Sequence, residues 1–330
     1  MISVVIPVYQ VSDYIERCIR SVMSQSYTDI ECIIVDDATK DDSIKKCERL
    51  IGDYEGPVRF RILHHKYNRG ISAARNTGTD AAIGEYIFYL DGDDVITQEC
   101  IEKLIRPIIK DKTIEMVTGG YMRVSVDYPI SPSEQPSKRK SEDIASHEAV
   151  RDYHFSKNYL VTAWNKLIKR DFLLQHQLYF KEGALFEVSA WLFFVMKYLS
   201  HLYVISDVTY LWYKRPSSIT TGTSKKEKAR HWCLAYEVIA NSFTPGESGR
   251  EAKFYIRKFC RRCICHPDNQ TFVRVSHLFE KALVGSQYKK ERVILALTVF
   301  MSRTTVGRHF YILALKLRDI SKVKEIRLNI

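Results

Sequence analysis

Residues 86–94 read Tyr-Ile-Phe-Tyr-Leu-Asp-Gly-Asp-Asp, an apolar run that ends in three closely spaced carboxylates. The apolar part is typical of a buried strand, and open α/β sheets bind ligands at the carboxyl ends of their strands. Carboxylates this close repel one another, so a protein either leaves them in water or neutralises them with a divalent cation. If a cation binds here, the turn Asp91–Asp94 is a site for a diphosphate.

The sequence around this turn alternates between strand and helix patterns. Residues 2–6 and 30–35 are continuous apolar runs of the kind buried in parallel sheets, and residues 13–26 between them have helical spacing. The alternation continues with helices predicted at 40–51, 72–82 and 97–110 and strands predicted at 58–63, 85–90 and 115–124. Such crossovers form a doubly wound, mostly parallel sheet flanked by helices. Residues 131–143, rich in proline, serine and charge, are expected to form a mobile loop.

Length and charge indicate two units. The chain has 330 residues, more than one domain usually holds, and its 45% hydrophobic content is ordinary for a folded protein. We predict an α/β domain at 1–222, with halves at 1–110 and 111–222, and a basic, mainly helical extension at 223–330. The net charge is −4 over residues 1–110 and +13 over residues 221–330. The basic extension favours an anionic partner, either lipid headgroups or nucleic acid, with solvated helix faces as the alternative.

The location is also predicted from the sequence. No apolar stretch reaches the ~18 residues needed to span a bilayer, and the first residues show no secretory signal. We therefore expect a cytoplasmic protein that meets the inner face of the membrane through its basic region, with its eight cysteines reduced. Cys260, Cys263, Cys265 and His266 lie close together, but so short a segment rarely completes a zinc site, and core packing is the preferred interpretation.

A second acidic pair, Asp36 and Asp37, follows the apolar run at 30–35, so both acidic groups are expected at one edge of the sheet. Tyr9 follows the first strand and offers a ring for stacking a pyrimidine, while aspartate accepts hydrogen bonds from a ribose or a base. Nucleotide binding accounts for these features together. Simpler roles stay open for each residue: the aspartates cap the next helix, Tyr9 packs in the core, and Arg75 pairs with a surface carboxylate.

Several short motifs carry a family resemblance. They are Ile-Ser-Val-Val-Ile-Pro-Val-Tyr at 2–9, Gln-Ser-Tyr at 25–27, Val-Asp-Asp at 35–37, Asn-Arg-Gly at 68–70, Ala-Arg-Asn at 74–76 and Leu-Asp-Gly-Asp-Asp at 90–94. In order and spacing they resemble family 2 glycosyltransferases. The resemblance implies the GT-A fold, with a nucleotide-binding half at 1–110 and an acceptor half at 111–222. It also implies transfer of a sugar from a nucleotide diphosphate with inversion.

The resemblance assigns roles to residues at the first two strand ends. Pro7 and Tyr9 are expected to line the base pocket. Asp37 is expected to contact uracil or ribose, and Asp36 to support that loop.

Further roles follow for the later motifs. Asn68, Gly70 and Arg75 are expected to bind the nucleotide, with Arg75 as a cationic contact to the diphosphate. Asp91 and Asp93 correspond to the DXD metal motif of the family. Mn²⁺ or Mg²⁺ held by these carboxylates would stabilise the charge that develops on the departing diphosphate.

The second half contains two segments that resemble those around the acceptor cleft of the family. They are residues 163–167 and 210–215, which contain Trp164, Lys166 and Arg215 as candidate acceptor contacts. Core packing accounts for Trp164 and Trp212 equally well, and a solvated charge is the alternative for each cation.

One position departs from the family pattern. Inverting members typically show Phe-x-Glu-Gly, a spacer and then Glu-Asp, in which the aspartate deprotonates the acceptor; here residues 180–188 place Val188 at that position. An isopropyl group accepts no proton, so Glu187 is the first substitute for the general base. Glu187 also suits a helix N-terminus on electrostatic grounds alone. Without a substitute base, the enzyme would transfer slowly or would bind donor without turnover.

The sequence thus predicts a metal-dependent inverting glycosyltransferase that uses a UDP-sugar and a saccharide or lipid-linked acceptor in surface polysaccharide synthesis. A donor-binding homologue with impaired catalysis is the main alternative. A nucleic-acid partner is not expected, because no zinc-finger spacing or RNA-binding motif accompanies the basic region. A phosphotransferase with Asp91 as nucleophile is disfavoured, because the acidic turn follows the fourth strand rather than an early one.

Overall fold

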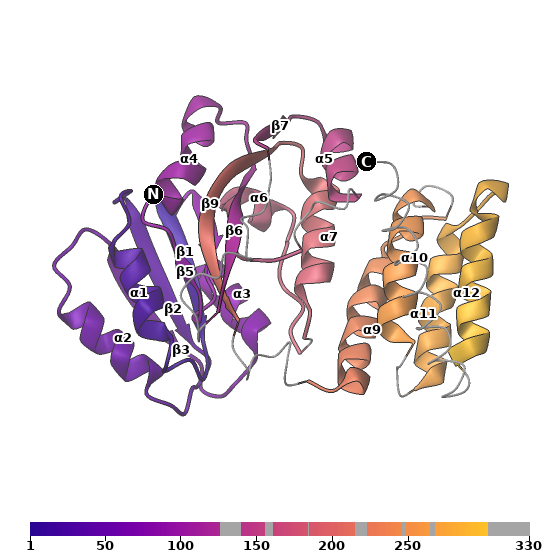
Figure 1. Cartoon of the computed structure of the whole chain (residues 1–330), viewed down its shortest axis with the longest axis horizontal. Coiled ribbons are helices and arrows are strands. Elements are labelled where there is room, and N and C mark those ends of the chain that lie inside the picture. The colour runs from indigo at the N-terminus through magenta and orange to yellow at the C-terminus, as the bar shows by residue number, and fades with distance from the viewer. Residues whose placement is uncertain are drawn as a thin grey trace. The chain divides into compact units, whose positions relative to one another are not determined.

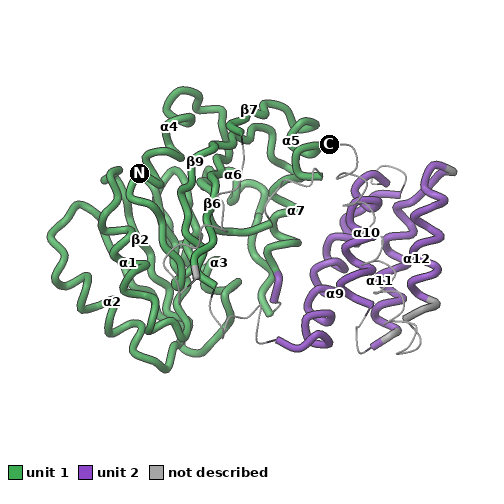
Figure 2. The backbone as a smooth tube through the Cα atoms, in the orientation of Figure 1, with its two compact units in different colours: residues 1–183, 187–218 green, residues 184–186, 219–330 purple. Residues whose placement is uncertain are grey.

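The computed structural model describes residues 1–125, 140–155, 161–183, 185–214, 223–245, 249–264 and 268–302. The chain forms two compact units (Figure 2). The first comprises residues 1–183 and 187–218, and the second comprises residues 184–186 and 219–330.

The first four strands of the first unit are parallel neighbours in the order β3-β2-β1-β4. They are β1 (Ile2–Val8), β2 (Ile30–Asp36), β3 (Arg59–His64) and β4 (Tyr86–Tyr89) (Figure 1). Their register pairs Val8 with Asp36 and Asp36 with His64, so the first three of these strands end at one level. This is the parallel arrangement that the sequence predicts.

Beyond β4 the sheet becomes mixed. The additional strands are β5 (Val95–Ile96), β6 (Met116–Ser125), β7 (Glu142–Ile144), β8 (Lys166–Lys169) and β9 (Leu202–Lys214). Strand β8 pairs antiparallel with both β4 and β6, whereas β6 and β9 are parallel. The prediction of a mostly parallel sheet therefore holds for the first half, and the second half adds antiparallel pairs that its weaker periodicity did not reveal.

Helices cover both faces of the sheet. Alternate residues of β1 point to opposite faces, with Val4 and Ile6 in one apolar cluster and Val5 in the other. The first cluster includes residues of α1 (Ile15–Met23), α2 (Ser43–Gly52) and α4 (Cys100–Lys110). The second includes residues of α3 (Ile71–Ala81), α5 (His147–Phe155), α6 (Arg170–Gln175) and α7 (Val188–Tyr198). Burial on both faces explains the continuous apolar strands.

Helix α2 begins three residues later than the predicted start at residue 40. The carboxylate of Asp41 accepts hydrogen bonds from the backbone N–H groups of Ser12 and Ser43 and from the hydroxyls of Thr39 and Ser43. These bonds hold a turn ahead of the helix, because aspartate competes for backbone donors. Most of the predicted loop at 131–143 lies outside the described residues, and β7 begins within its last part.

The second unit is helical, as predicted. It contains α9 (Lys225–Asn241), α10 (Gly249–Cys263), α11 (Asn269–Ala282), the 3₁₀ turn η1 (Ser286–Tyr288) and α12 (Lys289–Ser302). Phe259 lies in its core and stacks on Phe272 with ring centroids 4.9 Å apart. Cys260 and Cys263 are also buried in this unit, while Cys265 and His266 lie outside the described residues. Within the described part of the chain, no helix combines the length and apolarity needed to cross a membrane.

Candidate active site

The carboxyl ends of β1, β2 and β4 meet at one edge of the sheet. The backbone N–H of Asp37 donates to the carbonyl of Val8 (3.0 Å), which joins the loops after β1 and β2. A methyl group at Gly92 would lie 3.2 Å from the carbonyl oxygen of Pro7, so the acidic turn is packed against the end of β1. Tyr9 follows that end and is 39% exposed. The ring, the aspartate pair and the acidic turn therefore belong to one region.

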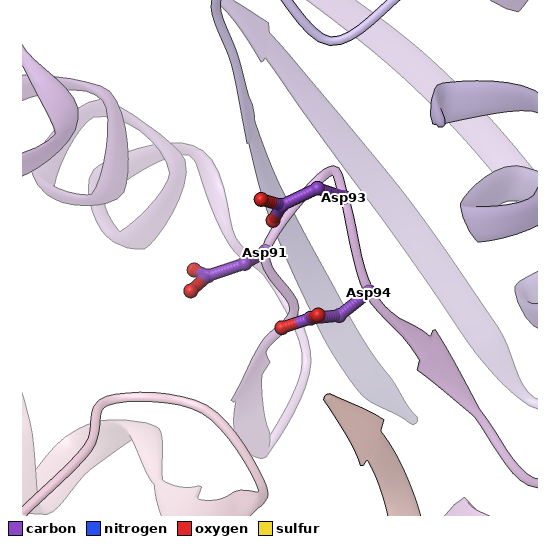
Figure 3. A group of neighbouring side chains, drawn as sticks. All are labelled: Asp91, Asp93 and Asp94. Atoms are coloured by element: carbon purple, nitrogen blue, oxygen red, sulfur yellow. The ribbon is translucent and has the colours of Figure 1, made fainter. Parts of the chain in front are cut away.

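The acidic turn presents three carboxylates to a common point. One oxygen from each of Asp91, Asp93 and Asp94 lies within 4.8 Å of the others, and Figure 3 shows the three side chains leaving the turn on the same side. Hard carboxylate oxygens are the ligands that Mg²⁺ and Mn²⁺ prefer. Three negative groups at this separation favour a bound divalent cation, so the residues present fit the metal that the sequence predicts.

Asp94 differs from the other two acids of the turn. It is 1% exposed, and its carboxylate accepts hydrogen bonds from the Tyr210 hydroxyl (2.7 Å) and the Tyr213 backbone N–H (2.8 Å). Burial raises the pKa of Asp94 well above its usual range, and the nearby Asp93 and Asp91 raise it further. Both of its oxygens are already used within the protein, so Asp91 and Asp93 are the better candidates for metal ligands.

Arg75 links the acidic turn to Glu187. Its guanidinium donates to Asp91 Oδ1 (2.8 Å) and to Glu187 Oε1 (2.7 Å), and its side chain is 3% exposed. Its Nε is buried and has no hydrogen-bond partner among the described residues. Two of its five N–H donors reach carboxylates, and the predicted contact of Arg75 with the diphosphate stays a prediction.

Glu187, rather than Val188, reaches the acidic site. The Glu187 side chain is 6% exposed, and burial raises the pKa of this carboxyl while the nearby Arg75 lowers it in part. Val188 is the first residue of α7 and packs against the second apolar cluster. Arg75 bonds to both Glu187 and Asp91 and so links the two carboxylates. The role of Glu187 in proton transfer stays a prediction.

The two aspartates after β2 differ in their hydrogen-bond partners and in their exposure. The Asp37 carboxylate is 3% exposed and accepts four hydrogen bonds, from the His65 ring, the Asn68 amide and the backbone N–H groups of Arg69 and Gly70. A carboxylate offers about four acceptor sites, so none remains for uracil or ribose. Asp37 holds the loop at 65–70 in this conformation, and the nucleotide contacts predicted for Asn68 and Gly70 stay predictions.

Asp36 keeps more of its surface. Its side chain is 13% exposed and accepts from the Thr39 N–H (2.8 Å) and contacts the His64 ring (3.0 Å). Each of its oxygens retains a lone pair, so Asp36 is the better candidate for a base or ribose contact. Pro7 is buried within β1, its carbonyl oxygen lies against Gly92 of the acidic turn, and its place in a base pocket stays a prediction.

The predicted acceptor residues lie inside the fold or outside the described residues. Trp164 is 8% exposed and stacks on Tyr210, with ring centroids 4.3 Å apart. Lys166 is 0% exposed, and its ammonium donates to the Thr162 hydroxyl (2.9 Å). These two side chains have packing roles here, and their contact with an acceptor rests on the sequence alone. Arg215 lies outside the described residues.

Sequence reasoning missed three residues that hold the acidic turn. Tyr210 and Tyr213 bind Asp94 from β9, and Arg17 on α1 donates to the backbone carbonyl of Asp93 (2.7 Å). The tyrosines lie in a segment that the sequence assigns to the acceptor cleft. No spacing rule joins any of these residues to a turn some 75 to 120 positions away in the chain, and only the fold reveals the contact.

A nucleotide-binding type of sheet with an acidic turn at the end of β4 defines the class of GT-A transferases. Residues 3–174 match the family model of glycosyl transferase family 2, more than half of the chain, and the chain belongs to this family. It is therefore a glycosyltransferase, which confirms the predicted family, fold class and type of enzyme. Glycosyltransferase GlyG of Streptococcus pneumoniae serotype 4 is 28% identical over 225 residues, covering 66% of this chain and 72% of that protein.

Solved structures are similar in fold. TarS of S. aureus, residues 1–349, has a TM-score of 0.65 at 19% identity, covering 94% of this chain and 91% of that one. TarS has also been solved with UDP-GlcNAc (TM-score 0.60, 18% identity, 93% and 82% covered). The mannosyltransferase PcManGT of Pyrobaculum calidifontis, solved with GDP-Man and Mn²⁺, has a TM-score of 0.54 at 16% identity, with 97% and 86% covered. At these identities the likeness establishes the fold.

Proposed function

We propose that this glycosyltransferase is metal-dependent and inverting, and that it takes its sugar from a UDP-sugar. The observation that carries the proposal is the convergence of Asp91 and Asp93 with the exposed ring of Tyr9 at one edge of the sheet. A nucleoside diphosphate has a base to stack and an anionic group that needs a cation, and this edge offers a partner for each. The nucleotide-sugar complexes of TarS and PcManGT support the same donor class.

The chain's own residues prepare this site in distinct ways. Asp91 and Asp93 would hold Mn²⁺ or Mg²⁺, which as a Lewis acid stabilises charge on the leaving diphosphate. Arg75 holds the Asp91 side chain in place by donating a hydrogen bond to its Oδ1. Tyr9 would stack on the base, and Asp36 would accept a hydrogen bond from it or from the ribose.

The general base decides between full activity and the alternative, a homologue that binds donor but transfers poorly. Glu187 is the nearest candidate, since it lies across Arg75 from Asp91. The two influences on Glu187 oppose each other, because burial raises the pKa of its carboxyl and favours proton acceptance, whereas the ion pair with Arg75 lowers the pKa in part and occupies one oxygen. Loss of a general base typically lowers the rate by ~10² to 10⁴-fold.

A donor screen followed by two variants tests the proposal. UDP-, GDP- and dTDP-sugars are titrated calorimetrically with and without Mn²⁺ or Mg²⁺, and we expect ion-dependent binding of the UDP compound. Hydrolysis and transfer are then compared for Glu187→Gln and Val188→Asp. Loss of turnover in Glu187→Gln supports Glu187 as base, whereas a gain in Val188→Asp supports the impaired homologue. Equal binding of the nucleotide-sugar with and without the divalent ion would refute metal dependence.

We further propose a saccharide or lipid-linked acceptor at an anionic membrane surface, which α10 would meet. Arg250, Lys253, Arg257 and Arg261 recur at helical spacing and are exposed, while Ala252, Ile256 and Phe259 form the buried face. Burial, and to a lesser extent the nearby Arg262, lowers the pKa of Lys258 on the same helix to about 8. Clusters of four or more cations on one helix face suit anionic lipid headgroups.

Vesicle sedimentation tests the membrane partner. We expect binding to phosphatidylglycerol vesicles but not to phosphatidylcholine vesicles. Each cation near such a surface contributes ~1 kcal/mol, so Arg257→Glu with Arg261→Glu should weaken partition by more than about tenfold. The matched control is Lys225→Glu with Lys226→Glu on α9, two exposed cations away from this face. Equal losses in both double variants would indicate net charge alone, and binding to DNA in preference to vesicles would favour a nucleic-acid partner.

A further inference from the structure

Arg17 occupies a place where a cation is not favoured by its own helix. It lies in the first turn of α1, where the positive end of the helix dipole disfavours a cation. The side chain nevertheless turns toward the acidic turn, and its Nη2 donates to the backbone carbonyl of Asp93 at 2.7 Å. A contact outside α1 therefore offsets the cost.

The guanidinium of Arg17 is held without a carboxylate. Among the described residues no acidic oxygen lies within 4.0 Å of it, and its Nε is buried with no hydrogen-bond partner. Its central carbon instead lies 3.7 Å from the ring centroid of Tyr213 and 4.9 Å from that of Tyr14. Stacking on these two rings fixes the plane of the guanidinium, and with it the direction of the bond to Asp93.

Tyr213 holds the neighbouring residue of the same turn. Its ring supports Arg17, and its backbone N–H donates to Asp94 Oδ1. Gly92 on the other side is packed against Pro7 and Val11. The turn is thus held on both sides of Asp93, and Arg17 holds the backbone of Asp93.

We propose that Arg17 and Tyr213 are positioning residues for the metal and diphosphate site, an inference that rests on the proposed function. A carbonyl anchored by a planar guanidinium fixes the peptide of Asp93, and the peptide sets where the Asp93 carboxylate points. Supporting contacts of this kind typically contribute 10- to 100-fold to metal affinity. Bare electrostatics acts in the opposite direction on Mn²⁺ alone, because a cation beside the site repels it, so the sign of the change in affinity for Mn²⁺ without UDP distinguishes the two effects when Arg17 is removed.

The experiment measures binding of UDP with Mn²⁺ by calorimetry, and of Mn²⁺ alone by electron paramagnetic resonance. We expect Arg17→Met to weaken Mn²⁺-dependent UDP binding by about tenfold or more, and Arg17→Lys to fall between it and the wild type, because lysine keeps the charge but loses the planar fork. Tyr213→Leu keeps the backbone donor and removes the ring, so a partial loss is expected. Arg20→Met, an exposed arginine one turn further along α1, is the matched control.

Thermal unfolding of every variant separates positioning from stability. A lowered melting temperature with wild-type Mn²⁺ and UDP constants would mean that Arg17 only stabilises the fold, and tighter Mn²⁺ binding in Arg17→Met would mean that it acts only through charge; either result overturns the inference. If the wild type binds no nucleoside diphosphate, the proposed function and this inference fall together. If the wild type binds and Arg17→Met binds equally well, the inference alone fails.

Discussion

The ends of β2 and β4 carry acidic groups of similar sequence but different surroundings. At β2, Asp37 is buried and its carboxylate accepts from four donors of one loop. At β4, Asp91, Asp93 and Asp94 gather their oxygens within 4.8 Å, and Asp91 has Arg75 as its ionic partner. The difference teaches that an aspartate saturated by the donors of one loop holds that loop, whereas aspartates whose oxygens gather at one point are suited to a cation.

The largest expected effect is a loss of stability when the ion pairs of Arg75 with Asp91 and Glu187 are removed. Arg75→Met would leave Glu187 buried beside Asp91 without the cation that compensates both. Removal of one partner from a buried ion pair typically costs about 3–5 kcal/mol, and we expect a loss of this size in the free energy of unfolding measured with urea. Arg69→Met is the control, since its pair with Glu182 is exposed and is expected to contribute less than about 1 kcal/mol. Equal losses of stability in the two variants would mean that the buried Arg75 pairs contribute no more than the exposed pair of Arg69 with Glu182.

A crossed pair of variants tests the comparison itself. Asp37→Ala should lower the free energy of unfolding by about 2–3 kcal/mol, because several buried donors lose their acceptor. Asp93→Ala should change stability by less than about 1 kcal/mol, since it relieves repulsion among like charges, yet it should abolish ion-dependent binding of UDP. Thermal unfolding and calorimetry give the stability and the UDP affinity of each of the two variants. The distinction fails if Asp93→Ala proves to be the less stable variant.

The smallest expected effect concerns Tyr9. Because the ring is 39% exposed, Tyr9→Ala should leave the unfolding temperature unchanged. It should weaken UDP binding by about fivefold, which corresponds to ~1 kcal/mol for one stacked ring. Tyr67→Ala, which removes a tyrosine that is 69% exposed, is the control. An unchanged dissociation constant for Tyr9→Ala would remove the base from the proposed pocket.

Much of the nucleotide-binding half was predictable because its signals are local. The apolar runs of β1, β2 and β4 are buried on both faces, so they are clear in the sequence alone, and the acidic turn directly follows the last of them. The distinction between Asp36 and Asp37 was not predictable, since two adjacent aspartates look alike until the donors of the loop at 65–70 are placed around one of them.

Contacts between distant residues lay beyond the sequence. Arg75 and Glu187 are 112 positions apart, and nothing in the motif around either residue specifies the other. Lys166 was expected to contact the acceptor, with a solvated charge as the alternative, and its burial beside the Thr162 hydroxyl has no signal in the local sequence. The mixed second half was equally hidden, because strand direction depends on pairing with β4 and β6 rather than on the composition of β8.

Strand β4 has a parallel neighbour on one side, β1, and an antiparallel neighbour on the other, β8. The acidic turn therefore lies at the boundary between the parallel and antiparallel parts of the sheet. Beside it, β8 contributes its amino end rather than a carboxyl end. The two strands that flank β4 at this boundary, β1 and β8, lie far apart in the sequence. The half of the molecule that would receive the acceptor therefore meets the donor edge at this boundary, and Tyr210 and Tyr213 of β9 make the acidic turn a part of both halves.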